Sequence, residues 1–147
     1  MIDAANLPKK TTLECNLSDL PSTVLERISF HLLDDEKICL CVLSSGYNEF
    51  EVAIVTTVRV VQTVVQVGKG IPKFGTMGYQ NNSLMLSELA GLEQNEGESP
   101  DRSGCYLTVL CGSRDLRFYF WNREICLKFA GAILSSADQL TKRFLRE

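Results

Sequence analysis

The sequence ends in a long amphipathic segment, and this feature constrains the fold more than any other. Residues 122–147 carry apolar side chains at spacings of three and four, which place them on one helix face: Cys126, Phe129, Ala130, Ile133, Ala137, Leu140 and Phe144. Asn122 precedes this stripe and is a favoured N-cap residue. The pattern predicts a helix of about six turns whose apolar face packs on another layer.

The segments before this helix are typical of antiparallel strands. Residues 37–45 are apolar on both faces, as expected of a strand that is covered on each side. Further segments alternate in polarity or are rich in β-branched residues, which fit a pleated sheet: 50–57, 58–67, 105–111 and 116–121. Because a short turn separates 37–45 from 50–57, we expect these two strands to form an antiparallel hairpin.

The remaining segments are less regular. Residues 18–33 predict an extra N-terminal helix, because Pro21 suits a first turn and apolar residues follow at helical spacing. Residues 1–17 are expected to form a flexible arm. Four glycines and a proline at 68–82 indicate a long loop or a broken hairpin, and 83–93 fits either a strand or one helical turn. Residues 94–104 are acidic and rich in breakers, which predicts an exposed loop.

Length and charge limit the classes of function. A chain of 147 residues with 45% hydrophobic residues fits one domain, here residues 18–147. The formal net charge is −3, and the isoelectric point is near 5.2. Nucleic-acid-binding domains usually carry a basic face. A nucleic-acid partner is therefore not expected, and neither is binding to a generic anionic membrane surface.

The cysteine pattern leads to a prediction about the compartment. The six cysteines lack C-x-x-C spacing: Cys15, Cys39, Cys41, Cys105, Cys111 and Cys126. Residues 1–14 contain no hydrophobic signal segment, and no run reaches the roughly 18 apolar residues of a membrane span. We therefore expect a cytoplasmic protein in a reducing compartment with six free thiols that serve as small buried hydrophobes. A zinc site is the minor alternative.

Motifs for catalysis are weak, so we expect neither an enzyme nor a cofactor. A nucleophile–base pair would have to use the single histidine, His31, which lies on a predicted helix surface. The glycine-rich segment 68–75 lacks the order of a phosphate-binding loop. Acidic residues at 93–101 do not follow the alternate spacing of a calcium loop.

The order of several local motifs resembles the pleckstrin-homology-like superfamily, in particular GRAM-type and bacterial-type domains. In the resemblance, an acidic-Glu-Lys turn (35–37) precedes the first strand, and Thr56, Arg59 and Val60 occupy a T-x-x-R-hydrophobic strand. The segment 84–93 resembles the start of a later strand, and 107–133 resembles the closing hairpin and helix. The likeness covers roughly residues 34–146. Profilin-like and longin-like domains, which also end in a helix, stay open as alternatives.

This resemblance implies an α+β fold. Its form is an antiparallel, partly open β-barrel or sandwich of about seven strands, which the C-terminal helix caps. The extra helix at 18–33 departs from a minimal domain of this kind. The implied function is a binding module for a protein partner, acting as an adaptor, a scaffold or a subunit of an intracellular assembly.

Two sets of candidate binding residues follow. The first set comprises apolar side chains on or beside the glycine-rich segment, where a protein partner is expected to bind: Phe74, Met77 and Tyr79. In a second interpretation, which stays open, Phe74 and Tyr79 fold back and cap the open end of the sheet. The alternative is a lipid headgroup, in particular a phosphoinositide, bound in an anion pocket of Lys37, Arg59, Lys69 and Lys73. Arg59 has a second interpretation, as a strand residue whose charge meets solvent or a carboxylate. No metal ligands are expected.

Overall fold

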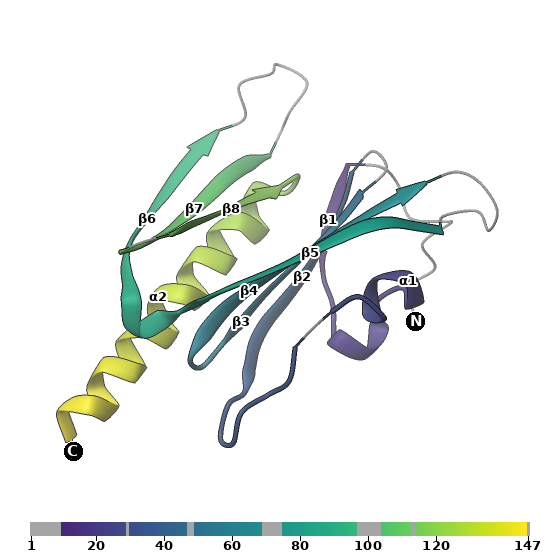
Figure 1. The fold of residues 1–147 in the computed structure, drawn as a ribbon. Helices are drawn as coiled ribbons and strands as arrows, with labels where there is room; N and C mark the ends of the chain where they lie inside the picture. Colours follow the sequence, from purple (N-terminus) through teal and green to yellow (C-terminus); the bar gives the residue numbers. More distant parts are fainter. Residues whose placement is uncertain are drawn as a thin grey trace.

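The computed structural model describes residues 10–28, 30–46, 49–68, 75–96, 104–112 and 114–146. In chain order the elements are β1 (Thr11–Glu14), η2 (Leu17–Asp19), α1 (Ser22–Leu25), β2 (Ile38–Gly46), β3 (Glu49–Thr56), β4 (Arg59–Gly68), β5 (Gly75–Met85), η3 (Leu86–Glu88), β6 (Leu89–Glu96), β7 (Cys105–Cys111), β8 (Asp115–Phe120) and α2 (Arg123–Arg146) (Figure 1). The fold is therefore α+β, with antiparallel strands and a long closing helix.

The strands form two separate antiparallel sheets. One sheet has five strands in the order β1-β2-β3-β4-β5, and the other has three in the order β6-β7-β8. The predicted hairpin of β2 and β3 is confirmed, with Gly46 opposite Glu49 at its closed end. Among the described residues the two sheets do not join into a closed barrel, so β5 and β6 are edge strands.

The helix α2 packs as its apolar stripe predicts. Cys126, Phe129 and Ile133 are fully buried against the sheets. The ring of Phe129 lies 5.3 Å and 5.2 Å, centroid to centroid, from the rings of Phe118 and Phe120 on β8. The Asn122 Oδ1 accepts hydrogen bonds from the backbone N–H groups of residues 124 (2.9 Å) and 125 (3.3 Å), which confirms the N-cap.

The five-stranded sheet is covered on both faces, which explains why β2 carries apolar side chains on both faces. Val42, on one face, packs in the core formed with the three-stranded sheet and α2. Leu43, on the opposite face, packs under the N-terminal segment, where Leu20 and Val24 are fully buried. Successive β2 side chains point to opposite faces, so two cores require two apolar faces.

The N-terminal region differs from the prediction. The helix expected at 18–33 is limited to η2 and the four residues of α1. After α1, side chains occupy backbone groups that a continuing helix would use. The Arg59 guanidinium donates a hydrogen bond to the His31 carbonyl, and the Glu36 carboxylate accepts one from the Leu33 N–H. The arm expected at 1–17 contains β1, which pairs with the β2 edge. Residues 1–9 lie outside the described residues.

The described part of the segment 68–82, expected as a long loop or a broken hairpin, belongs to a hairpin whose register is irregular. From Gly75 onward it belongs to β5, which pairs with β4 up to Arg59 opposite Met85 and shifts register at Gln66/Val67. The long β-branched strand β4 offers a free edge, and this outweighs the low strand preference of the glycines. The ambiguous segment 83–93 contains the end of β5, the helical turn η3 and the start of β6.

One prediction about the cysteines is wrong. A disulfide joins Cys105 at the start of β7 to Cys126 in the first turns of α2, with the two Cα atoms 6.8 Å apart. Both residues are fully buried, so the bond lies within the core between the sheet and the helix. Cys15, Cys39, Cys41 and Cys111 are free. In the described part of the chain, no helix has the length and apolar character needed to cross a membrane.

Candidate protein-binding site

Arg59, a member of the predicted anion pocket, forms an ion pair with an acidic residue. Its guanidinium donates two hydrogen bonds to Glu36, from Nε to Oε2 (2.9 Å) and from Nη2 to Oε1 (3.0 Å). The side chains of Arg59 and Glu36 are 18% and 1% exposed. The two motifs of the resemblance, the acidic turn and the T-x-x-R strand, thus meet in one ion pair.

Further contacts fix this pair in place. The Glu36 carboxylate also accepts from Thr56 Oγ1 and from the Leu33 N–H (2.8 Å). Burial opposes ionisation of Glu36, but the hydrogen bonds from Arg59, Leu33 and Thr56 outweigh it and lower the Glu36 pKa. The Phe30 ring lies 4.7 Å from the Arg59 guanidinium. Arg59 therefore anchors the segment before β2 to the β3–β4 turn.

The other members of that pocket are not brought together with Arg59 by any described contact. Lys37 is exposed and bonds through its backbone N–H to Thr57 Oγ1 (3.2 Å). Lys69 and Lys73 lie outside the described residues. The second interpretation of Arg59, a strand residue that meets a carboxylate, agrees with its geometry.

The predicted protein-binding residues lie on or beside β5. Tyr79 is 57% exposed, and the Arg27 guanidinium lies 5.4 Å from the centre of its ring. Met77 belongs to β5, and Phe74 lies outside the described residues. Tyr79 is thus a surface residue on an edge strand and not part of the core.

A second surface stands out near the C-terminal end of α2, and sequence reasoning did not predict it. Two hollows share Leu140, and we call them together the α2-end groove. The strand-side hollow, of about 280 Å³, lies between η3, the start of β6 and α2, and is lined by Leu86, Ser87, Leu89, Ala137, Leu140, Thr141 and Leu145. Its walls are mainly aliphatic.

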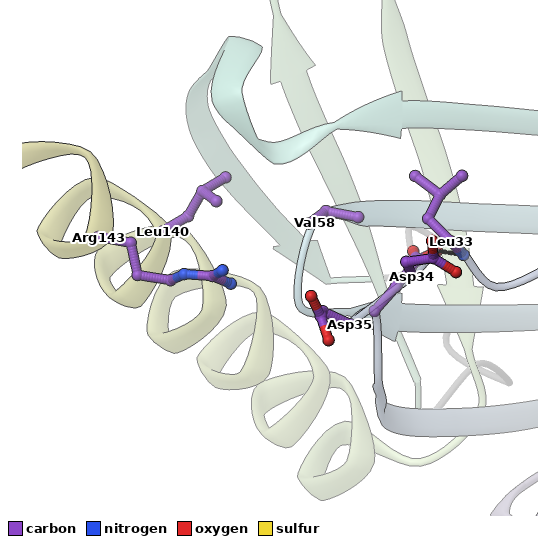
Figure 2. A pocket seen from close by; sticks show the side chains of 7 residues that line it. Leu33, Asp34, Asp35, Val58, Leu140 and Arg143 are labelled. Carbon is purple, nitrogen blue, oxygen red and sulfur yellow. Dashed lines mark hydrogen bonds between the residues drawn. The ribbon is translucent and has the colours of Figure 1, made fainter. Parts of the chain in front are cut away.

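The loop-side hollow is smaller and more polar. It measures about 220 Å³ and is lined by Leu33, Asp34, Asp35, Glu36, Val58, Leu140 and Arg143. Figure 2 shows Arg143 on α2 reaching toward Asp35 on the facing loop, with Leu140 on the helix side of the hollow and Val58 on the loop side. The backbone links the two hollows as well, because the Leu86 N–H donates to the Val58 carbonyl (2.8 Å).

Large apolar side chains remain exposed around the α2-end groove. Leu145 is 82% exposed, and Leu33 is 56% exposed. Leu32 and Met85, next to the lining residues Leu33 and Leu86, are also exposed. Contiguous exposed apolar surface marks interaction sites more often than isolated apolar residues do.

The groove also meets the free edge of a sheet. Leu89 lines the strand-side hollow and is the first residue of β6, the edge strand of the three-stranded sheet. An edge strand presents unpaired backbone N–H and C=O groups, to which an extended peptide can add. Glu88 and Glu93 are exposed along the same stretch of chain. The surface therefore combines an aliphatic hollow, a strand edge and acidic side chains.

Comparison with known proteins adds no relative. No family model, no curated protein and no solved structure matches this chain.

A signal for the α2-end groove was present in the sequence. A helix of 24 residues is about 36 Å long, whereas a strand of six residues such as β8 covers about 20 Å. The apolar stripe of α2 is therefore longer than the sheet beneath it can cover. Figure 1 shows the last turns of α2 extending past the corner where β5 leads into β6.

Proposed function

We propose that this chain is a pleckstrin-homology-like module that binds a segment of another protein and catalyses no reaction. The order of the strands supports the assignment: four antiparallel strands, β2 to β5, precede three, β6 to β8, and one long helix, α2, closes the domain. The strand β1 and the short helices η2 and α1 are additions at the N-terminus. A cytoplasmic location, expected from the sequence, is part of this proposal.

The observation that carries the function is the junction of the strand-side hollow with the β6 edge at Leu89. We infer that the partner is an extended peptide segment. Its backbone pairs with the outer edge of β6, and one large apolar side chain enters the hollow between Leu86, Leu140 and Leu145. A volume of about 280 Å³ lies at the lower limit of small-molecule sites, about 300–1,000 Å³, and suits a single side chain.

Charge selects among such segments. Glu88 and Glu93 are exposed on the strand side. These carboxylates attract a peptide that carries Lys or Arg next to its apolar side chain, and this attraction raises the association rate. A segment that alternates apolar and basic residues fits both the strand period and these carboxylates. The phosphoinositide alternative relies on Lys37, Lys69 and Lys73, because the charge of Arg59 is already paired with Glu36.

Selection from a library of short random peptides on the immobilised protein tests this function. The expected peptides share a large apolar residue flanked by Lys or Arg. Methylation of alternate backbone amide nitrogens of a selected peptide should weaken binding strongly, because strand addition requires these donors. Selected peptides that are acidic, or that tolerate N-methylation at every position, would contradict strand addition to β6.

A further inference from the structure

Cys15 and Cys41 face each other across two neighbouring strands. The β1–β2 register ends with Glu14 opposite Val42, and one step further Cys15 stands opposite Cys41. The Cys15 N–H donates to the Cys41 carbonyl (3.0 Å), and the two Sγ atoms are 3.7 Å apart. Directly opposed, hydrogen-bonded residues of antiparallel strands have Cα atoms about 5.5 Å apart, a separation that disulfides commonly span.

The two thiols differ in access to solvent. Cys41 is only 4% exposed and packs in the core under the N-terminal segment. Cys15 is partly exposed. Both line a surface cavity of about 300 Å³ that lies beyond the end of β1, with Leu17 and Leu40 among its walls. A small reagent can therefore reach Cys15 first, while Cys41 stays protected behind it.

Electrostatics favour the same order. The hydrogen bond between the two sulfur atoms lowers the pKa of Cys15, against the opposing effects of burial and of the nearby Asp19 carboxylate. The same hydrogen bond, together with burial, raises the pKa of Cys41. The thiolate is the nucleophilic form of cysteine, so Cys15 is the more reactive member of the pair.

We propose that Cys15 is a hydroperoxide-reactive thiol and that Cys41 is its resolving partner. The Cys15 thiolate attacks one peroxide oxygen, the O–O bond breaks, and hydroxide leaves, which converts Cys15 to a sulfenic acid. The Cys41 sulfur then attacks the Cys15 sulfur, the S–O bond breaks, and the thiol proton leaves with the hydroxyl group as water. The protein loses two electrons and the peroxide gains them. A thiol reductant reverses the bond by exchange.

The other free thiols lack this arrangement. The Cys39 sulfur lies 3.4 Å from Ser136 Oγ on α2 and 3.9 Å from the Lys37 carbonyl. Burial, followed by the charges of Glu88 and Asp115, raises the pKa of Cys111. Cys39 is exposed and lines the same cavity, but its sulfur contacts a hydroxyl and a carbonyl and not a second thiol. A Cys15–Cys41 bond ties the segment that follows β1 to β2. This inference does not depend on the proposed peptide-binding function.

Mass mapping of the full-length protein tests the inference without any substitution. The folded protein is treated with a small excess of hydrogen peroxide, free thiols are alkylated in denaturant, and the peptides are mapped. The expected product is a Cys15–Cys41 linked peptide, lighter by two hydrogens, that dithiothreitol abolishes. Preferential oxidation of Cys39 or Cys111, or no Cys15–Cys41 link, would overturn the proposal.

Trapping of the intermediate assigns the two roles. In Cys41→Ser the sulfenic acid cannot be resolved, so dimedone should label Cys15 several-fold more than in the wild type. In Cys15→Ser, Cys41 should remain reduced because it is shielded. Cys39→Ser is the matched control and should form the Cys15–Cys41 link at the wild-type rate. Equal dimedone labelling of Cys15 in the wild type and in Cys41→Ser would contradict the resolving role.

Discussion

Glu36 and Arg59 form two hydrogen bonds of 3.0 Å and 2.9 Å that connect the segment before β2 to the start of β4. Removal of the cation leaves a carboxylate that is 1% exposed without its charged partner. Breaking a buried pair in this way costs about 3–5 kcal/mol. We therefore expect Arg59→Ala to lower the free energy of unfolding by about that amount in urea titrations at pH 7.

A surface pair provides the control for this prediction. Lys128 and Glu14 also lie within 2.8 Å, but both are exposed, so Lys128→Ala should cost at most about 1 kcal/mol.

The lowered pKa of Glu36 makes the contribution of the Glu36–Arg59 pair depend on pH. The ionised pair contributes stability above pH 4.5, the ordinary pKa, and this contribution is lost as the pH falls through the lowered value. The free energies of unfolding of the wild type and of Arg59→Ala should therefore converge in acid. A difference that stays constant with pH would contradict the assignment.

Glu51 has the opposite pH dependence. Burial raises its pKa to about 7, against hydrogen bonds from Gln62 and the Tyr119 backbone, and the neighbouring Glu49 raises it further. The folded state thus binds a proton more tightly than the unfolded state, so stability present below pH 4.5 is lost as the pH rises through about 7. Glu51→Gln should melt higher than the wild type at pH 8 and equally at pH 4. Glu93→Gln, at an exposed position whose charge does not contribute to the Glu51 shift, should leave the pH profile unchanged.

The docking of α2 can be tested at its centre. Phe129 is fully buried against Phe118 and Phe120, so Phe129→Ala should cost about 3–5 kcal/mol. Ile133→Asp places an unpaired charge in the same core and should be comparably damaging. Leu134 is exposed on the opposite face, and Leu134→Ala should stay within about 0.5 kcal/mol of the wild type. Equal melting temperatures for all variants would show that the helix is not docked.

Two glycines are expected to respond in opposite directions to the same change. A Cβ on Gly104 would overlap the Phe120 carbonyl, whereas Gly131 in α2 has open space around it. Gly104→Ala should therefore destabilise the fold by about 1–3 kcal/mol or more. Gly131→Ala should stabilise it by about 0.5–1 kcal/mol, because alanine has the higher helix propensity. Urea titration measures both, and a stabilising Gly104→Ala would contradict the close approach.

Sequence periodicity was sufficient where local pattern and burial agree. The stripe on α2 and the apolar alternation in β3, β7 and β8 predicted those elements, because one buried face imposes its period on the residues. Sequence periodicity failed where contacts with residues distant in the sequence determine the local structure. The apolar spacing at 24, 25, 28 and 32 favours a helix, but the Arg59 guanidinium binds the His31 carbonyl, and residues 30–33 are not helical. The polar strand β1 forms only because β2 offers an edge.

The binding surfaces, too, depend on contacts between residues that are distant in the sequence. The motif residues Glu36 and Arg59 were visible in the sequence, but their contact joins positions 23 residues apart, a separation that no local pattern encodes. Leu140 was assigned to the core stripe, and in the structure it is shared by two hollows. The α2-end groove depends on where the sheet stops beneath the helix, and this is set by tertiary packing.

The central claim is that the α2-end groove binds a peptide, and calorimetric titration of a selected basic–apolar peptide tests it most directly. Leu145→Glu and Leu134→Glu both change an exposed leucine of α2, but only Leu145 lines the groove. A buried leucine contact contributes about 1.5–3 kcal/mol. Leu145→Glu should therefore weaken binding at least about tenfold, and Leu134→Glu should bind like the wild type. Equal affinities for the two variants would contradict the claim, as would phosphoinositide-vesicle binding that Lys69→Glu/Lys73→Glu abolishes and Leu145→Glu leaves intact.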